Sequence, residues 1–170
     1  MFDFNLNDHV YRLLQNEPFF AALSRRIDKK VGPIPTAGVR VNEEGHFEML
    51  YNPDFFAGLT DDQRTGVLVH EFYHLVFEHV TGRLPDELAA CMGGKPTAAE
   101  RQLFKLWNIG ADLSINYHIG ADNLPENCCI PGGKMFEEMP GDKAAEWYYD
   151  QLKKKMKEQE EKNQENGEGE

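Results

Sequence analysis

The sequence predicts an α+β domain that is mainly helical and carries one small β-hairpin or sheet. Three observations predict it: apolar residues recur at helical spacing in several segments, one stretch alternates apolar and polar residues, and capping or turn residues separate these segments. A length of 170 residues with 41% hydrophobic residues indicates one domain with an ordinary core. We place this domain at residues 1–152, followed by a polar tail at 153–170 that is expected to become disordered.

The N-terminal part is expected to form two short helices. The first lies within residues 5–15, where Asn7 or Asp8 can act as its N-cap. Pro18 suits the first turn of the second helix, because proline has no backbone N–H to lose there. The Pro- and Gly-containing segment 31–38 is expected to be a loop.

The alternating stretch GVRVNEEGHFEMLYN, residues 38–52, predicts a β-hairpin with its turn at Asn42–Gly45. Phe47, Met49 and Tyr51 share one side of the second strand. An edge strand of this hairpin could pair with an extended peptide by β-augmentation.

A capping box opens the next helix. Thr60 is followed three residues later by Gln63, so the helix is expected to begin at residue 61. Nothing in the sequence breaks it before Gly82. The segment VLVHEFYHLVFEH, residues 67–79, is therefore expected to lie in the middle of a helix.

A second capping box, Thr97 with Glu100, opens a helix that is expected to run to about His118. The long segment 121–135 is expected to be a loop beside a site. Asp142 is expected to cap a last helix before the polar tail.

Charge and composition exclude some classes of function. The formal charge of −11 disfavours binding to nucleic acid or to an anionic membrane surface. The sequence shows neither a signal peptide nor a stretch of 18 apolar residues, so we expect a cytoplasmic protein. The three cysteines form no CxxC pair and are expected to be reduced thiols.

Residues 70–74, HEFYH, match the pattern H-E-x-x-H. On a helix, His70 and His74 lie one turn apart on one face, so their imidazoles can bind one Zn²⁺. Glu71 lies roughly 100° around the helix from His70, near enough to reach a water on the metal. The expected chemistry is hydrolysis, with Glu71 as the general base that takes a proton from this water. The alternative is a core helix whose histidines hold no metal.

A catalytic zinc ion needs a third protein ligand. Asn108, Asp112 and Asn116 recur every four residues within an otherwise apolar helix, so Asp112 is the expected ligand. His118 and Glu78 are the alternatives, although Glu78 lies one turn too far along the same helix for one tetrahedral ion.

Several other residues are assigned supporting roles. Asn108 and Asn116 are expected to orient ligands or hold substrate, and the neighbouring Gly110 to let the two helices approach each other closely. Tyr117 is the expected donor to the oxyanion, with Tyr73 and His118 as alternatives. His79 lies roughly 140° around the helix from His74 and is expected to be a partly exposed residue without a role at the metal.

The segments VLVHEFYHLVFEH, YNPDFFAGLTDDQRTGVLVHE, LWNIGADLSIN and KAAEWYYDQL together resemble the putative metallopeptidase domain of bacteria and phages. The resemblance covers about residues 17–152. It implies a zincin-like fold with His70 and His74 as metal ligands and Glu71 as catalytic residue, and it fits Asp112 as the third ligand. Larger relatives carry a von Willebrand factor A-like domain after this one, so the resemblance also implies a partner protein in its place.

The sequence therefore predicts a small cytoplasmic zinc metallopeptidase with Zn²⁺ as cofactor and a polypeptide as substrate. Two alternatives stay open. One is a non-catalytic module that keeps the metal for stability or for partner binding, although a structural zinc site would need four ligands and no base. The other is a metal-dependent hydrolase of a non-peptide amide, which a deep closed pocket would favour.

Overall fold

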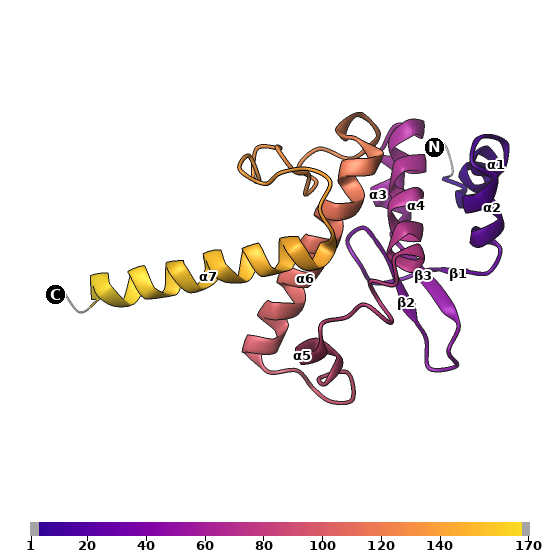
Figure 1. Ribbon diagram of the computed structural model, residues 1–170. Helices are drawn as coiled ribbons and strands as arrows, with labels where there is room; N and C mark the ends of the chain where they lie inside the picture. The colour runs from indigo at the N-terminus through magenta and orange to yellow at the C-terminus, as the bar shows by residue number, and fades with distance from the viewer. Residues whose placement is uncertain (1–3, 168–170) are drawn as a thin grey trace. The chain divides into compact units, whose positions relative to one another are not determined.

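The computed structural model describes residues 4–167 and has the predicted α+β class: it contains several helices and one three-stranded sheet (Figure 1). The chain divides into two compact units. The first extends to Leu84 and includes His118–Cys128; the second comprises Pro85–Tyr117 and the chain from Cys129 onward. Among the described residues, no helix has both the length and the hydropathy that a membrane crossing requires.

The first unit begins with the two expected helices, α1 (Leu6–Asn16) and α2 (Pro18–Ser24). Pro18 occupies the first turn of α2, as predicted. The cap of α1 was placed too late in the sequence-based prediction: Asn5 is the N-cap, and its side-chain oxygen accepts a hydrogen bond from the backbone N–H of Asn7 at 3.1 Å. Three asparagine or aspartate residues lie within four positions here, and only the backbone conformation decides which of them caps the helix.

The predicted hairpin is confirmed by strands β2 (Ala37–Val41) and β3 (Phe47–Tyr51), which pair antiparallel. A strand that the sequence analysis missed, β1 (Asp28–Val31), pairs parallel with β3 and gives the order β1-β3-β2. Its sequence, DKKV, has no apolar alternation, because three of its residues are charged and it lies at an edge of the sheet. Of the two hairpin strands, β2 is the one that lies at an edge of the sheet.

Glu48 in the central strand ties the three strands together. Its carboxylate is almost fully covered, and it pairs with Lys30 of β1 at 2.7 Å and with Arg40 of β2 at 2.6 Å. The hydrogen bonds from Lys30 and Arg40 lower the pKa of the Glu48 carboxyl. Met49, which points to the opposite side, is completely buried in the apolar core.

Two helices follow the sheet: α3 (Pro53–Ala57), capped by Asn52, and α4 (Asp61–Val76). The predicted capping box of α4 is present in full: the Thr60 hydroxyl accepts from the Gln63 N–H, and the Gln63 side-chain oxygen accepts from the Thr60 N–H. One face of α4 packs into the core of the first unit, whose largest fully buried side chains are Leu13, Met49, Phe56, Leu68 and Phe72.

Part of the expected loop at 121–135 is a short 3₁₀ helix, η1 (Ala121–Asn123), that packs against α4. The contact is made at Gly66, where an added Cβ would lie 1.7 Å from the backbone oxygen of Asn123. Gln63 also donates from its side-chain amide to the backbone oxygen of Leu124 at 3.4 Å. Only glycine at position 66 lets the two backbones approach so closely.

The second unit contains α5 (Asp86–Ala89), most of α6 (Ala98–Ile119) and α7 (Ala145–Gly167). The second predicted capping box is also present: the Thr97 hydroxyl accepts from the Glu100 N–H at 3.2 Å, and the Glu100 carboxylate accepts from the Thr97 N–H at 2.6 Å.

Gly110 has a different role from the one predicted. An added Cβ at Gly110 would lie 3.0 Å from backbone atoms of Ala145 and Tyr149, so this glycine permits the close approach of α6 to α7. Asp142 does not cap α7, because it has a left-handed backbone with φ of 57° and the helix begins at Ala145. The helix continues to Gly167, well into the polar segment. The proposed domain boundary at residue 152 stays a prediction.

Candidate metal centre

The positions of His70 and His74 follow from the phase of α4. The helix turns its apolar stripe, which includes Leu68, Phe72 and Leu75, into the core of the first unit. His70 and His74 lie on another stripe and are only partly buried. Because four residues make slightly more than one turn, the two imidazoles project from neighbouring turns in nearly the same direction. The motif therefore lies on a helix, as predicted, but in the C-terminal part of α4 rather than in its middle.

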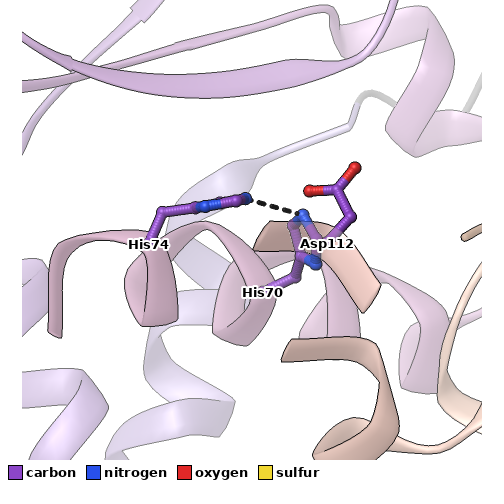
Figure 2. A group of neighbouring side chains, drawn as sticks. All are labelled: His70, His74 and Asp112. Carbon is purple, nitrogen blue, oxygen red and sulfur yellow. Dashed lines mark hydrogen bonds between the residues drawn. The ribbon is translucent and has the colours of Figure 1, made fainter. Parts of the chain in front are cut away.

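The imidazoles of His70 and His74 face each other through their Nε2 atoms. Nε2 of His70 and Nε2 of His74 are 3.1 Å apart, and the rings are nearly perpendicular, with an interplanar angle of 84° (Figure 2). Two nitrogens bound to one tetrahedral zinc ion, each at about 2.0–2.1 Å, lie roughly 3.3 Å apart. The spacing of the histidine pair thus fits a shared metal ion, and in the metal-free protein it equally fits a hydrogen bond between the rings.

Glu71 lies beside this pair but in a more buried position. Only 6% of the residue is exposed. Its carboxylate oxygen Oε1 is 4.0 Å from Nε2 of His70, which is too far for a direct hydrogen bond. A carboxylate buried this deeply is costly unless a positive group lies near it, and a bound metal ion would be such a group.

The end of α4 differs from the prediction. The helix ends at Val76 rather than near Gly82, because Glu78 has a left-handed backbone with φ of 56°. Glu78 therefore leaves the stripe of His70 and His74, which removes the reason for considering it as a ligand. His79, predicted to be partly exposed and remote, is instead 2% exposed, and its Nδ1 is 3.3 Å from Nδ1 of His74. That part of the prediction is wrong.

A cavity of about 510 Å³ borders a different stripe of α4. Val69 and Tyr73 line it from α4, and His118 lines it from the last turn of α6. Neither His70 nor His74 belongs to its lining. This position does not favour His118 as a metal ligand. Tyr73 packs against the ring of Phe20, with ring centroids 5.0 Å apart.

The remaining predicted residues belong to α6 in the second unit. Asp112 is partly buried, whereas Asn108 is exposed. Asn116 is buried, and its side-chain amide donates to the backbone oxygen of Cys129 at 2.8 Å, which anchors the following loop. Tyr117 is 46% exposed and its ring lies over Gly141, where an added Cβ would be 2.3 Å from the ring.

Within residues 4–167, one group of side chains that could hold a metal ion consists of His70, His74 and Asp112, which Figure 2 draws together. Sequence reasoning found all three from their spacing. It missed His79, because the turn that carries His79 has glutamate at the position where glycine usually signals such a turn. The only signal in the sequence was a third histidine close to the motif.

Comparison with known proteins identifies the family. The model of the family described as a putative metallopeptidase domain matches residues 4–170. The chain therefore belongs to this family, as its motifs suggested, and the match is longer than the stretch over which we noted the resemblance. No curated protein and no solved structure matches the chain. Membership indicates a metal-dependent peptidase in general terms, without naming a metal or a catalytic residue.

Proposed function

We propose that this chain, as a member of the putative metallopeptidase domain family, is a zinc-dependent peptidase with a zincin-like arrangement of its site. One observation carries the proposal: the Nε2 atoms of His70 and His74 face each other at 3.1 Å, beside the buried carboxylate of Glu71. Two neutral nitrogens and a nearby base form the part of a hydrolytic zinc site that one helix can supply. The helix α4 supplies all three groups.

We further propose Asp112 as the third ligand. Aspartate oxygen is a common zinc ligand, and a catalytic site uses three protein ligands so that one position stays open. Asp112 lies on a polar stripe of α6 and is the one charged residue between positions 106 and 117. It is also the carboxylate that, with the two imidazoles, could hold a metal ion. Three ligands of this kind support a catalytic site over a structural one, which would be closed by four.

In this proposal, Glu71 moves the proton during hydrolysis. Zinc, when bound, supplies a Lewis acid that brings the pKa of a coordinated water to about 7. Glu71 accepts the proton from the attacking water and then delivers it to the nitrogen of the departing amine. The burial of Glu71 suits this role, because a carboxylate shielded from bulk water keeps the transferred proton available for the leaving group.

We propose a polypeptide as the substrate. The edge strand β2 belongs to the sheet and packs near α4, and an extended peptide can add to an edge strand through backbone hydrogen bonds. Tyr117 stays the proposed donor to the oxyanion. A cytoplasmic location and a separate partner protein in place of a von Willebrand factor A-like domain also stay proposals; neither nucleic acid nor a membrane surface suits the acidic chain.

Metal analysis and peptide cleavage test the proposed function. The purified protein should contain about one zinc ion per chain, and His70→Ala and His74→Ala should each lose it. His46→Ala is the matched control, because His46 is an exposed histidine on the hairpin turn and its loss should leave the metal content unchanged. Glu71→Gln should retain zinc and lose cleavage of a library of synthetic peptides.

The results separate the alternatives. If the Glu71→Gln variant retains zinc and still cleaves peptides, Glu71 is not the general base. A wild-type protein that binds zinc but cleaves no peptide would favour the binding module or the hydrolase of another amide. Comparison of new protein N-termini in cells that produce the wild type or Glu71→Gln would then identify the natural substrates.

A further inference from the structure

The turn that follows α4 returns the chain onto the motif. The N–H of His79 donates to the backbone oxygen of His74 at 2.9 Å, and the N–H of Glu78 donates to that of Leu75 at 3.1 Å. Together with the left-handed Glu78, these two bonds form a Schellman motif, a common way to end a helix. In a Schellman motif, the residue that follows the left-handed residue contacts the side chain of the residue five positions before it. Here those two residues are His79 and His74.

The two side chains meet through their Nδ1 atoms. Nδ1 of His79 lies 3.3 Å from Nδ1 of His74, and the ring centroids are 5.4 Å apart. The contact is sheltered, because His79 is only 2% exposed and the ring of Phe77 lies 5.7 Å away on its flank. A hydrogen bond that is shielded from water holds its partners more firmly than one on the surface.

This contact fits two tautomers of His74, one for each direction of the hydrogen bond, and only one of the two leaves a lone pair on Nε2. A neutral imidazole carries its hydrogen on one nitrogen and a lone pair on the other. If Nδ1 of His74 donates to Nδ1 of His79, the lone pair of His74 is left on Nε2, the atom that faces His70. A histidine that binds a metal normally donates its other ring N–H to a hydrogen-bond acceptor, most often a carboxylate, a backbone carbonyl or water.

We propose that His79 is a positioning residue for His74: it accepts a hydrogen bond from Nδ1 of His74 and thereby presents the Nε2 lone pair for metal binding. The proposal rests on the proposed metal site and adds the group that orients one of its ligands. It also gives the early end of α4 a function, because a straight helix would carry residue 79 roughly 140° away from His74.

Two substitutions of His79 separate orientation from packing. His79→Phe keeps a ring of similar size and removes the acceptor, whereas His79→Asn keeps an acceptor oxygen near the position of Nδ1 and removes the ring. We expect His79→Phe to weaken zinc binding about 10- to 100-fold, measured by competition with a chelator. The zinc affinity of His79→Asn should remain within about threefold of that of the wild type. This change is much smaller than the loss expected when His74 has no hydrogen-bond partner at Nδ1. Glu78→Gly, which keeps the left-handed turn, is the matched control and should bind zinc as the wild type does.

A second measurement does not depend on metal or on activity. In the metal-free wild type and in His79→Asn, nitrogen NMR at neutral pH should show the hydrogen of His74 on Nδ1, and in His79→Phe it should show a mixture of tautomers. The proposal is overturned if the wild type carries this hydrogen on Nε2, or if His79→Phe and His79→Asn weaken zinc binding equally. If the wild type binds no zinc, the proposed function fails, and the tautomer of His74 still decides whether His79 orients it.

Discussion

The two ends of α4 are built differently, although one helix joins them. The N-terminal end is closed by side chains: Thr60 and Gln63 satisfy each other's backbone N–H groups. The C-terminal end is closed mainly by the backbone, through a left-handed Glu78 and two hydrogen bonds to earlier carbonyl oxygens, and the Arg83 side chain adds a hydrogen bond to the backbone oxygen of Phe77. A cap made by side chains can be recognised from residue types, whereas a cap made by backbone conformation can be recognised only when glycine marks it.

The difference matters for function because the site lies nearer the second end. The capping box sets where α4 begins and so fixes the phase of His70 and His74 on the helix. The C-terminal turn decides which residue reaches the far side of the His74 ring, and that residue is His79. The first end therefore determines where the two proposed ligands point, and in our proposal the second end determines how firmly His74 is held.

The largest expected effect is in the N-terminal half of α4. Gly66→Ala should destabilise the protein by about 3 kcal/mol, because the new Cβ would collide with the backbone oxygen of Asn123 and force η1 off the helix. Thermal and denaturant unfolding measure this loss. Gly93→Ala is the control, because an added Cβ there meets nothing within 4 Å. Equal stability of Gly66→Ala and the wild type would show that η1 moves away from α4 freely.

The next effect tests the C-terminal end. Glu78→Val should destabilise the protein by about 1–2 kcal/mol, because a β-branched residue fits the left-handed conformation poorly. Glu78→Gly should instead stabilise it by up to about 1 kcal/mol, since glycine adopts this conformation without steric cost. Chemical denaturation of the pair gives both values. Opposite signs are the essential result; a loss in both variants would mean that the Glu78 side chain, not its backbone, holds the turn.

A smaller effect is expected at the capping box. Thr60→Ala should cost about 1 kcal/mol, because the hydroxyl that accepts from Gln63 is lost. Thr60→Ser, which keeps the hydroxyl, should restore most of this stability when both variants are unfolded in urea. Neither variant should change zinc affinity, because the cap lies more than two helical turns from His70. Weaker zinc binding in Thr60→Ala would mean that fraying of the helix end reaches the proposed metal site.

The smallest effect concerns the sheet, which serves as a reference outside α4. The pKa of the Glu48 carboxyl is lower in the folded protein than in the unfolded chain. The ionised carboxylate therefore stabilises the folded protein at pH values above its unfolded pKa of about 4.3. This stabilisation is lost as the pH falls through the folded pKa. Glu48→Gln should therefore make the melting temperature fall less steeply with acidification below about pH 5. Melting curves at several pH values check this, and an unchanged slope would contradict it.

Much of the fold and most of the candidate site followed from local sequence. Both capping boxes, the hairpin and the proline at the start of α2 depend on contacts within a few residues, and the predictions that relied on them are confirmed. The spacing of the two histidines is likewise local, because one helical turn brings them together. The strand β1 was missed because its pairing with β3 joins segments about twenty residues apart and leaves no alternation in its own sequence.

The sequence by itself determined that α4 exists, where it begins, and that two imidazoles and a carboxylate project from it, because helix geometry and side-chain capping are properties of neighbouring residues. Only the tertiary structure decided that α4 stops at Val76 and that His79 is buried against His74. It also decided that Gly110 serves the contact of α6 with α7. The physical reason is the same in each case. Packing in the folded protein can hold a residue in a backbone conformation, or bring it a contact partner, that its local sequence does not favour.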